Sequence, residues 1–355
     1  MNNDIIASIR AAMPATQVHL ADRMALVRGE YIATDLDERL SASLDALLRT
    51  LISRQPIEEE APRSARNETR SLIVVGEAGA GKTAALNHAF RTHPVLGGYG
   101  TLGSGCPIAR VVVPAPCTLK ALGIAILNAL GYPLMRDLRE NAVWTRVHEA
   151  LQISGTVILH LDEMHNLTDK ANILELDAIR KALKGLMISR EWPVGLVVSG
   201  LPSLVPAMRE IDEVRRRGRF LRIPLLSMPN DEPLLGEAMK RCCELAGIEL
   251  PEGLSVELGP RLSHAGLHRY GIAVELVHEA IETCLLDDGA VLAVDHFATA
   301  YMARTGCGDR MNPFVAPDWP DIDTTAVLLD EMPPEPVMPE DPKPRRRGRP
   351  SKRRA

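Results

Sequence analysis

The stretch SLIVVGEAGAGKT, residues 71–83, joins a short apolar run to a glycine-rich turn that ends in Lys-Thr. The apolar run, residues 71–75, does not alternate with polar residues, which is typical of a strand buried on both faces in a parallel sheet. The rest has the form G-x-x-x-x-G-K-T, which is typical of a phosphate-binding loop when it follows a strand and opens a helix. The stretch therefore predicts a strand, a phosphate loop and a helix, in that order.

The loop is expected to bind ATP through its main chain. A glycine-rich turn before a helix directs several backbone N–H groups at one point, where the helix N-terminus adds partial positive charge that suits phosphate oxygens. Lys82 is expected to reach the β- and γ-phosphates and to act in hydrolysis, and the Thr83 hydroxyl to ligate Mg²⁺. The residues predicted to bind the nucleotide here are Gly76, Glu77, Ala78, Gly79, Ala80, Gly81, Lys82, Thr83 and Ala84.

A second motif, VILHLDE at residues 157–163, places two acids at the end of an apolar run. Ligands of open parallel sheets bind at the carboxyl ends of the strands. Asp162 is predicted to hold Mg²⁺ through water, and Glu163 to polarise the attacking water, so that the chain is an Mg²⁺-dependent ATP hydrolase. His160, inside the run, is predicted to be a packed core histidine. His165 is a candidate link between the γ-phosphate and DNA, with a plain polar contact as the alternative.

Short apolar runs alternate with helical patterns through the middle of the chain. This alternation predicts an α/β fold, in which a parallel sheet is flanked by helices. Residues 232–301 show helical spacing without a clear strand, which predicts a helical lid domain behind the sheet. The later strands are expected at 109–113, 156–161, 194–199 and 222–225, and the helices between them at 119–130, 143–153 and 177–190.

The chain is expected to divide into five segments. Leucines spaced by three and four predict a helix over 35–52, which Thr34 can cap. Residues 311–342 contain no Lys or Arg, eight prolines and eight acids, a composition that cannot bury enough surface to order itself. The segments are an N-terminal helical segment and loop (1–69), the phosphate-loop core (70–227), the helical lid (228–308), an acidic Pro-rich linker (309–342) and a basic tail (343–355).

Composition indicates a globular protein of the cytoplasm. The chain has 355 residues, 46% of them hydrophobic, which suffices for a buried core. Its six cysteines show no CxxC pair and are expected to be reduced thiols. The N-terminus has no basic lead before its apolar residues, so a signal peptide is not expected. Prolines interrupt the longest apolar stretch, so no membrane span is expected either.

Three further positions are candidates for sensing the nucleotide. Ser199, at the end of an apolar run, is expected to offer its hydroxyl near the γ-phosphate, with an ordinary strand-end serine as the alternative. Arg269, at a helix start, is expected to sense nucleotide from the lid. Arg219 is the candidate for acting on a neighbouring subunit's nucleotide, because an arginine cluster is hard to bury in a monomer. The cluster also contains Arg215, Arg216 and Arg217, and a solvated or DNA-facing surface is its alternative role.

The order of GEAGAGKT, ILHLDEMHNL, PVGLVVSGLPSL, RRGRF and GLHRYGIAVELVHEAI resembles the AAA+ ATPases, and more narrowly the TniB and TnsC-like transposition ATPases. The likeness runs from Tyr31 to Phe314. A glycine-rich insertion at 97–105 and Leu201, where the family often has threonine, depart from the pattern. The resemblance implies a homo-oligomer, a ring or helical filament around double-stranded DNA. It also implies that this assembly marks a target and recruits a transposase, with a target-selection protein as a possible further partner.

The basic tail resembles an AT-hook around Arg-Gly-Arg-Pro. An extended segment of this kind fits a narrow minor groove, whose negative potential attracts arginine. A basic tail that binds nucleic acid generally, or an acidic partner, is the alternative. The residues predicted to contact DNA are Arg345, Arg346, Arg347, Gly348, Arg349, Pro350, Lys352, Arg353 and Arg354.

Two other functions are compatible with the same motifs. One is an ATP-binding scaffold or signalling module whose partner is a protein, although the basic tail argues against it. The other is a loader for a replicative helicase. A helicase itself is disfavoured, because only about 190 residues follow the Asp-Glu pair, too few for a second large domain with accessories.

Overall fold

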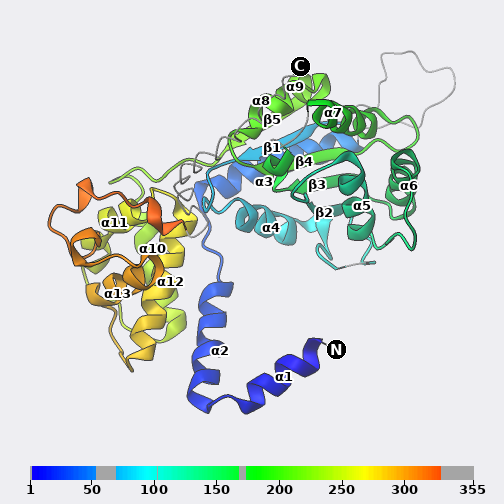
Figure 1. The fold of residues 1–355 in the computed structure, drawn as a ribbon. Coiled ribbons are helices and arrows are strands. Elements are labelled where there is room, and N and C mark those ends of the chain that lie inside the picture. Colours follow the sequence, from blue (N-terminus) through cyan, green and yellow to red (C-terminus); the bar gives the residue numbers. More distant parts are fainter. Residues whose placement is uncertain (1, 53–68, 102, 168–172, 329–355) are drawn as a thin grey trace, which may run out of the picture.

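A five-stranded parallel sheet runs through the part of the molecule drawn at the upper right in Figure 1. The computed structural model describes residues 2–52, 69–101, 103–167 and 173–328. The strand order is β2-β3-β4-β1-β5, so the strand before the phosphate loop has neighbours on both sides. Leu72 of β1 lies opposite Val197 of β4 and Arg219 of β5. The strands are β1 (Ser71–Val75), β2 (Ile108–Val112), β3 (Ile158–Asp162), β4 (Gly195–Gly200) and β5 (Gly218–Arg222).

The expected α/β sheet is confirmed, and only its fifth strand is misplaced. We expected that strand at 222–225, whereas β5 ends at Arg222. Pro224 cannot donate to a ladder, so the apolar residues that attracted the prediction lie past the strand end. Because β5 is an edge strand, paired with β1 alone among the described strands, it can expose Arg219 and Phe220. Its sequence lacks the apolar run of a central strand.

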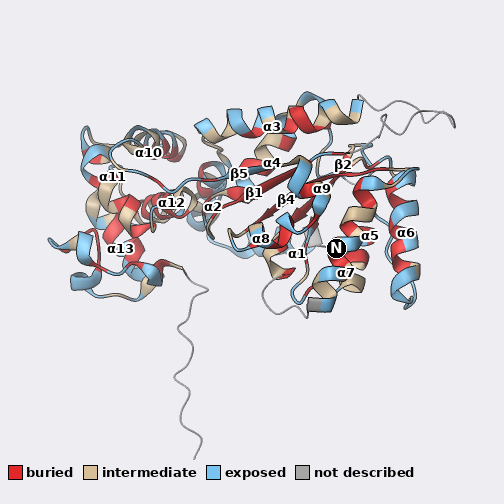
Figure 2. Cartoon of the chain, turned by 90° about the horizontal axis from the view of Figure 1, so that it is seen from above, coloured by how far each residue is buried: buried red, intermediate tan, exposed pale blue. Residues whose placement is uncertain are grey.

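Helices cover both faces of the sheet (Figure 2). On one face, α3 (Asp35–Ile52) and α4 (Lys82–Thr92) pack Leu44 and Phe90 against Val74 and Val197. The first of these helices has the expected bounds, and the Thr34 hydroxyl accepts the backbone N–H of Leu36 at 3.2 Å. The other face is covered by α5 (Leu119–Ala129), α6 (Glu140–Ile153) and α7 (Ile173–Ile188), within a few residues of their expected bounds.

Four helices after the sheet form a lid with its own core. The lid helices are α10 (Glu232–Ala246), α11 (Leu254–Ala265), α12 (Tyr270–Leu286) and α13 (Val294–Thr305). Near the N-terminus, α2 (Ala15–Gly29) buries Met24 and Val27 in the lid rather than against the sheet. The preceding helix, α1 (Asn2–Ala12), lies at the far end of α2 (Figure 1). Shorter elements are α8 (Leu204–Arg209), α9 (Asp212–Arg217), and the 3₁₀ turns Pro94–Leu96, Met164–Leu167, Asp309–Met311, Trp319–Asp321 and Thr325–Val327.

The segment after α13 packs onto the lid. Asn312 is 1% exposed; its side chain donates to the Ala298 carbonyl at 2.8 Å and accepts the Phe314 N–H at 3.1 Å. Phe314 is 4% exposed and contacts the Phe297 ring at 5.4 Å between centroids. The expectation that residues 309–342 form an unordered linker is therefore wrong for 309–328. The average composition does not reveal a few buried apolar residues, such as Phe314 and Val327, that pack residues 309–328 against the lid.

All six cysteines are free thiols, and four of them are buried. None of the described helices is both long and apolar enough to cross a bilayer. The residues proposed for DNA contact, 345–354, lie outside the described residues.

We predict that Phe314→Ala lowers the free energy of unfolding of the lid by about 3–5 kcal/mol, since it removes a buried ring and leaves a cavity. The adjacent Val315 is 48% exposed, so Val315→Ala is the matched control and should change stability by less than about 0.5 kcal/mol. Urea denaturation followed by circular dichroism measures both. Equal effects of the two substitutions would contradict the packing of this segment.

Candidate nucleotide-binding site

The loop between β1 and α4 has the backbone conformation that its glycines permit. Gly79 and Gly81 have φ values of +69° and +88°, which side-chain-bearing residues rarely adopt. Gly81 is the N-cap residue of α4, and its carbonyl accepts the N–H of Ala85 at 3.0 Å. The first N–H groups of a helix have no partner within the helix. At this end of α4 they are therefore available to an anion in the loop.

Lys82 places its ammonium group inside this loop. The residue is 7% exposed, and Nζ donates to the carbonyls of Gly76 at 3.0 Å and Glu77 at 2.9 Å. Burial lowers the pKa of Lys82, while the negative charges of Glu163 and Asp162 oppose that shift. The loop thus holds a cation against two of its own carbonyls, at the place where a phosphate is expected.

Asp162, at the end of β3, faces the start of α4. Its carboxylate is 1% exposed and accepts the Thr83 hydroxyl at 3.3 Å and the Ser199 hydroxyl at 2.5 Å. Burial alone raises the pKa of Asp162, but the Ser199 hydrogen bond and the neighbouring Arg110 guanidinium hold that pKa below its ordinary value. The carboxylate is therefore ionised at neutral pH, as a magnesium ligand must be.

His160 supports this carboxylate from inside the sheet. The ring is fully buried, packs edge-on to Phe90 at 5.2 Å, and has Nε2 at 2.9 Å from the Ser199 hydroxyl oxygen. Burial lowers the pKa of His160 to about 4, so it is neutral. Because the Ser199 hydroxyl donates to Asp162, its oxygen accepts from His160. The prediction of a packed core histidine is confirmed, and the Ser199 hydroxyl faces Asp162 in this structure.

Glu163 is held in an unusual backbone conformation beside the loop. Its φ is +57°, a left-handed value that costs free energy for a residue other than glycine. Its N–H donates to Asp162 Oδ1 at 3.1 Å and its carbonyl accepts the Asn166 N–H at 3.1 Å. The carboxylate is 41% exposed, with His165 Nε2 at 3.4 Å from Oε2. A solvent-accessible carboxylate next to Lys82 and Asp162 is suitably placed to orient a water.

The lid contacts the phosphate loop directly, through the first turn of α12. The Ile272 N–H donates to the Gly79 carbonyl at 3.1 Å, and Arg269 Nη1 donates to the Ala78 carbonyl at 3.1 Å. A Cβ added to Gly271 would lie 2.4 Å from the Gly79 oxygen, so only glycine fits there. Arg269 was expected at this position, whereas Gly271 was not identified, because one helical glycine gives no signal until the loop lies against it.

The arginine cluster lies at the sheet edge, away from the loop of its own chain. Arg219 is exposed in β5 and lies opposite Leu72, near the start of β1, whereas the loop follows the end of that strand. Four strand residues separate the two levels, or about 13 Å. Arg215 Nη2 donates to Asp212 at 2.6 Å, and Arg209 lies over the Phe220 ring at 5.3 Å. Arg219 is therefore exposed at this edge of the sheet and lies at a different level from its own loop.

Two contacts of the site were not found by sequence reasoning. Arg110 Nη2 lies 2.7 Å from Asp162 Oδ2, and the signal was available, since a charged residue inside an apolar strand needs a partner. Tyr31 stacks on His88 at 3.8 Å between ring centroids, and its hydroxyl donates to Asp37 at 2.6 Å. This second contact fixes the segment between α2 and α3, which joins lid to core, and it depends on residues far apart in sequence.

The residues present fit a magnesium ion. In the part of the chain that the structure describes, no group of three or more His, Cys, Asp or Glu could hold a metal. Magnesium in nucleotide sites uses one or two carboxylates with phosphate and water oxygens, so the Thr83 hydroxyl and the Asp162 carboxylate are the expected kind of donor set. These two side chains would hold the ion against the phosphates.

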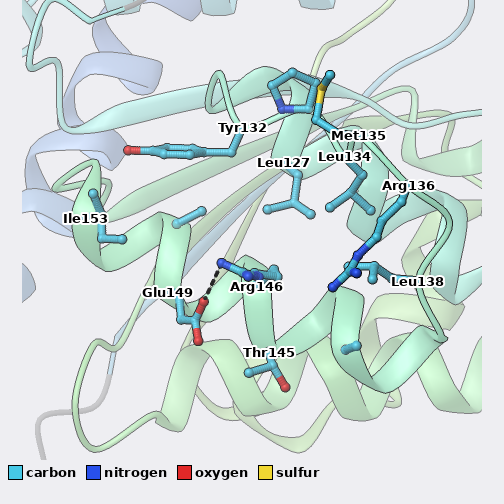
Figure 3. A pocket seen from close by; sticks show the side chains of 13 residues that line it. Leu127, Tyr132, Leu134, Met135, Arg136, Leu138, Thr145, Arg146, Glu149 and Ile153 are labelled. Atoms are coloured by element: carbon cyan, nitrogen blue, oxygen red, sulfur yellow. Dashed lines mark ion pairs between the residues drawn. The ribbon is translucent and has the colours of Figure 1, made fainter.

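A separate hollow of about 680 Å³ is lined by residues of α5, of α6 and of the segment between them (Figure 3). Leu127, Leu134 and Leu138 form its apolar wall, and Arg146 pairs with Glu149 at 3.4 Å across its rim. It contains none of the residues predicted for nucleotide binding.

Comparison with known proteins agrees with this arrangement. Residues 65–208 match the protein family described as AAA domain, whose members are nucleotide hydrolases. The core has the fold of an AAA+ ATPase. No curated protein sequence matches the chain.

Solved structures resemble the AAA+ core together with the lid. The Aeropyrum pernix ORC1 protein in complex with DNA matches with a TM-score of 0.57 and 18% identity, over 81% of this chain and 70% of its own. The ORC2 protein of the same organism, as ADPNP-ADP complexes, matches with a TM-score of 0.57 and 17% identity, over 78% and 71%. Cdc6p from Pyrobaculum aerophilum matches with a TM-score of 0.54 and 14% identity, over 78% and 69%. At these identities the likeness concerns the fold.

We predict that Gly271→Ala weakens binding of a fluorescent ADP analogue by about tenfold. The added methyl group collides with the Gly79 carbonyl, and relieving such a collision costs about 1–3 kcal/mol, here by moving the loop or the lid. The matched control is Gly185→Ala, a helical glycine of α7 with nothing within 4 Å of the added Cβ. That substitution should stabilise the fold by about 0.5–1 kcal/mol and leave the affinity unchanged. Wild-type affinity in Gly271→Ala would show that the lid contact does not shape the loop.

Proposed function

We propose that this AAA+ protein is an Mg²⁺-dependent ATPase that oligomerises on duplex DNA and selects the target for a transposase. The observation that carries the proposal is the contact of the lid with the phosphate loop. Gly79 belongs to the loop that would hold phosphate, and its carbonyl accepts the N–H of Ile272 in the lid. A change at the phosphates would therefore act on the position of the lid, and through it on the surfaces between subunits.

The side chains around the loop divide the hydrolytic work. Lys82 meets the charge of the β- and γ-phosphates, and Thr83 and Asp162 hold the metal. Magnesium, when bound, would neutralise charge that develops on the phosphates. Glu163 orients the attacking water and accepts its proton. Ser199 acts from behind Asp162, through the hydrogen bond that fixes one carboxylate oxygen, and Arg269 reads the loop from the lid.

The exposed arginine edge supports assembly. Arg219 is exposed on an edge strand, at a different level of the sheet from its own loop, where a neighbouring subunit can approach. An arginine supplied in this way stabilises transition-state charge and makes hydrolysis depend on assembly. We propose that Arg219 of one subunit completes the site of the next, in a ring or a helical filament.

The DNA and transposase parts of the proposal rest on the sequence. The motif order resembles the TniB and TnsC-like transposition ATPases, and the tail at 343–355 contains eight basic residues around Arg-Gly-Arg-Pro. A similar fold has been solved in complex with DNA in the Aeropyrum pernix ORC1 protein. The tail would add minor-groove and phosphate contacts to those that the assembled core makes.

We predict that Glu163→Gln binds ATP normally but hydrolyses it about a hundredfold more slowly or worse, because the amide cannot accept the proton of the attacking water. The variant should accumulate as an assembled form on DNA. Phosphate release and light scattering measure these two effects. Glu149→Gln, which changes a carboxylate paired with Arg146 on α6, is the matched control and should behave as wild type. Release of phosphate at the wild-type rate from Glu163→Gln would remove this residue from catalysis.

We predict that a chain ending at residue 328 keeps ATP-dependent binding to duplex DNA. The cut leaves Asn312, Phe314 and Val327 packed on the lid, so the lid retains its core. Loss of eight basic residues should reduce the slope of log affinity against log salt by up to about 7. Filter binding across a salt series tests this. A protein-binding scaffold with an incidental basic tail would instead lose all affinity for DNA.

A further inference from the structure

Both oxygens of the Asp162 carboxylate already have partners within the chain. Oδ1 accepts the Ser199 hydroxyl at 2.5 Å and the Glu163 N–H at 3.1 Å. Oδ2 accepts the Arg110 guanidinium at 2.7 Å and the Thr83 hydroxyl at 3.3 Å. A carboxylate buried to this degree requires a compensating cation, and among the described residues Arg110 is the one that forms an ion pair with it.

The oxygen that binds Arg110 is the one that faces the expected metal position. Thr83 and Asp162 would share the magnesium ion, and the Thr83 hydroxyl lies against Oδ2 rather than Oδ1. Charged groups a few ångströms apart interact strongly where water is scarce. A guanidinium and a divalent cation directed at one oxygen therefore repel each other, and binding of the second must weaken the contact of the first.

The two sides of the carboxylate differ in their freedom to move. On the Oδ1 side, Ser199 and His160 are fully buried inside the sheet and have no room to withdraw. On the Oδ2 side, the Arg110 side chain is 35% exposed and belongs to β2, an edge strand. Arginine can therefore exchange its carboxylate contact for water while His160 and Ser199 keep the carboxylate in place.

We propose that Arg110 is an internal counter-ion of Asp162 that Mg²⁺ displaces, so that Arg110 sets how strongly nucleotide binding depends on the metal. The inference rests on the nucleotide site proposed above. Without metal, Arg110 neutralises Asp162 and lets a nucleotide approach without repulsion between carboxylate and phosphate. With metal, the ion pair opposes the ion. Both effects reduce the advantage of Mg²⁺-nucleotide over metal-free nucleotide, which makes Arg110 a positioning residue and not a catalytic one.

The test measures Kd for a fluorescent ADP analogue in EDTA and in saturating Mg²⁺. The quantity compared between variants is the ratio of Kd in EDTA to Kd in Mg²⁺. Arg110→Met keeps the apolar stem and removes the charge, so the ratio should rise about tenfold over wild type, mostly through weaker metal-free binding. Arg146→Met is the matched control: this arginine also pairs with a carboxylate, at 3.4 Å, but on α6. Its ratio should equal that of wild type.

A double variant separates the loss of the ion pair from a general disturbance of the site. In Asp162→Asn there is no carboxylate to neutralise, so adding Arg110→Met should change the ratio by less than about twofold. The inference is overturned if Arg110→Met changes the ratio tenfold in the Asp162→Asn protein. It is also overturned if Arg110→Met leaves the ratio unchanged in the protein that keeps Asp162. If Arg110→Met does not fold, Arg110→Lys replaces it: the single ammonium lengthens the ion pair, and the ratio should rise about threefold. An unchanged ratio in Arg110→Lys would then be the contrary result.

The same measurements distinguish two kinds of failure. A wild-type protein that binds no nucleotide in either condition contradicts the proposed ATPase function itself. A wild-type protein that binds nucleotide, with ratios that Arg110 does not influence, contradicts only the role given to Arg110.

Discussion

The approach of one backbone to another at Gly79 and Gly271 is the constraint on which the two-part architecture depends. The phosphate loop has to turn through left-handed conformations to direct its N–H groups inward, and the first turn of α12 then lies against the outside of that turn, where no Cβ fits on Gly271. Since Ile272 also donates to the Gly79 carbonyl, a change in this peptide alters both the anion site and the lid. One contact therefore connects the chemistry of the core to the position of the lid.

The charge balance beneath the phosphate loop is set by one buried carboxylate, that of Asp162. Asp162 remains ionised because Ser199, His160 and Arg110 together offset the cost of its burial. Each partner comes from a different strand. The parallel register places Arg110 opposite His160, two residues before Asp162, and Ser199 two residues past the β4 partner of His160. The edge strand β2 thus contributes a cation that a central strand, buried on both faces, could not hold so readily.

Sequence alone predicted those parts of the molecule whose physics is local. The phosphate loop, the Asp162-Glu163 pair and the helix over 35–52 each depend on residues close together in the chain, and all appear where the pattern placed them. The fifth strand was misplaced because an edge strand lacks the apolar run that marks a buried one. The order of residues 309–328 was not predicted, because it depends on single buried side chains such as Phe314 and Val327, which average composition does not reveal. Arg110 and Gly271 were missed since their importance depends on neighbours 52 and about 190 residues away.

The central proposal is that a triphosphate held by main-chain groups at residues 76–83 joins subunits around a double helix. Electron cryomicroscopy of the protein with duplex DNA, Mg²⁺ and a non-hydrolysable ATP analogue tests this most directly. The account predicts density for the γ-phosphate at Lys82, metal between Thr83 and Asp162, and an arginine from the β5 edge of the next subunit approaching that phosphate. Single subunits with the nucleotide bound elsewhere, or an assembly without DNA at its centre, would contradict it.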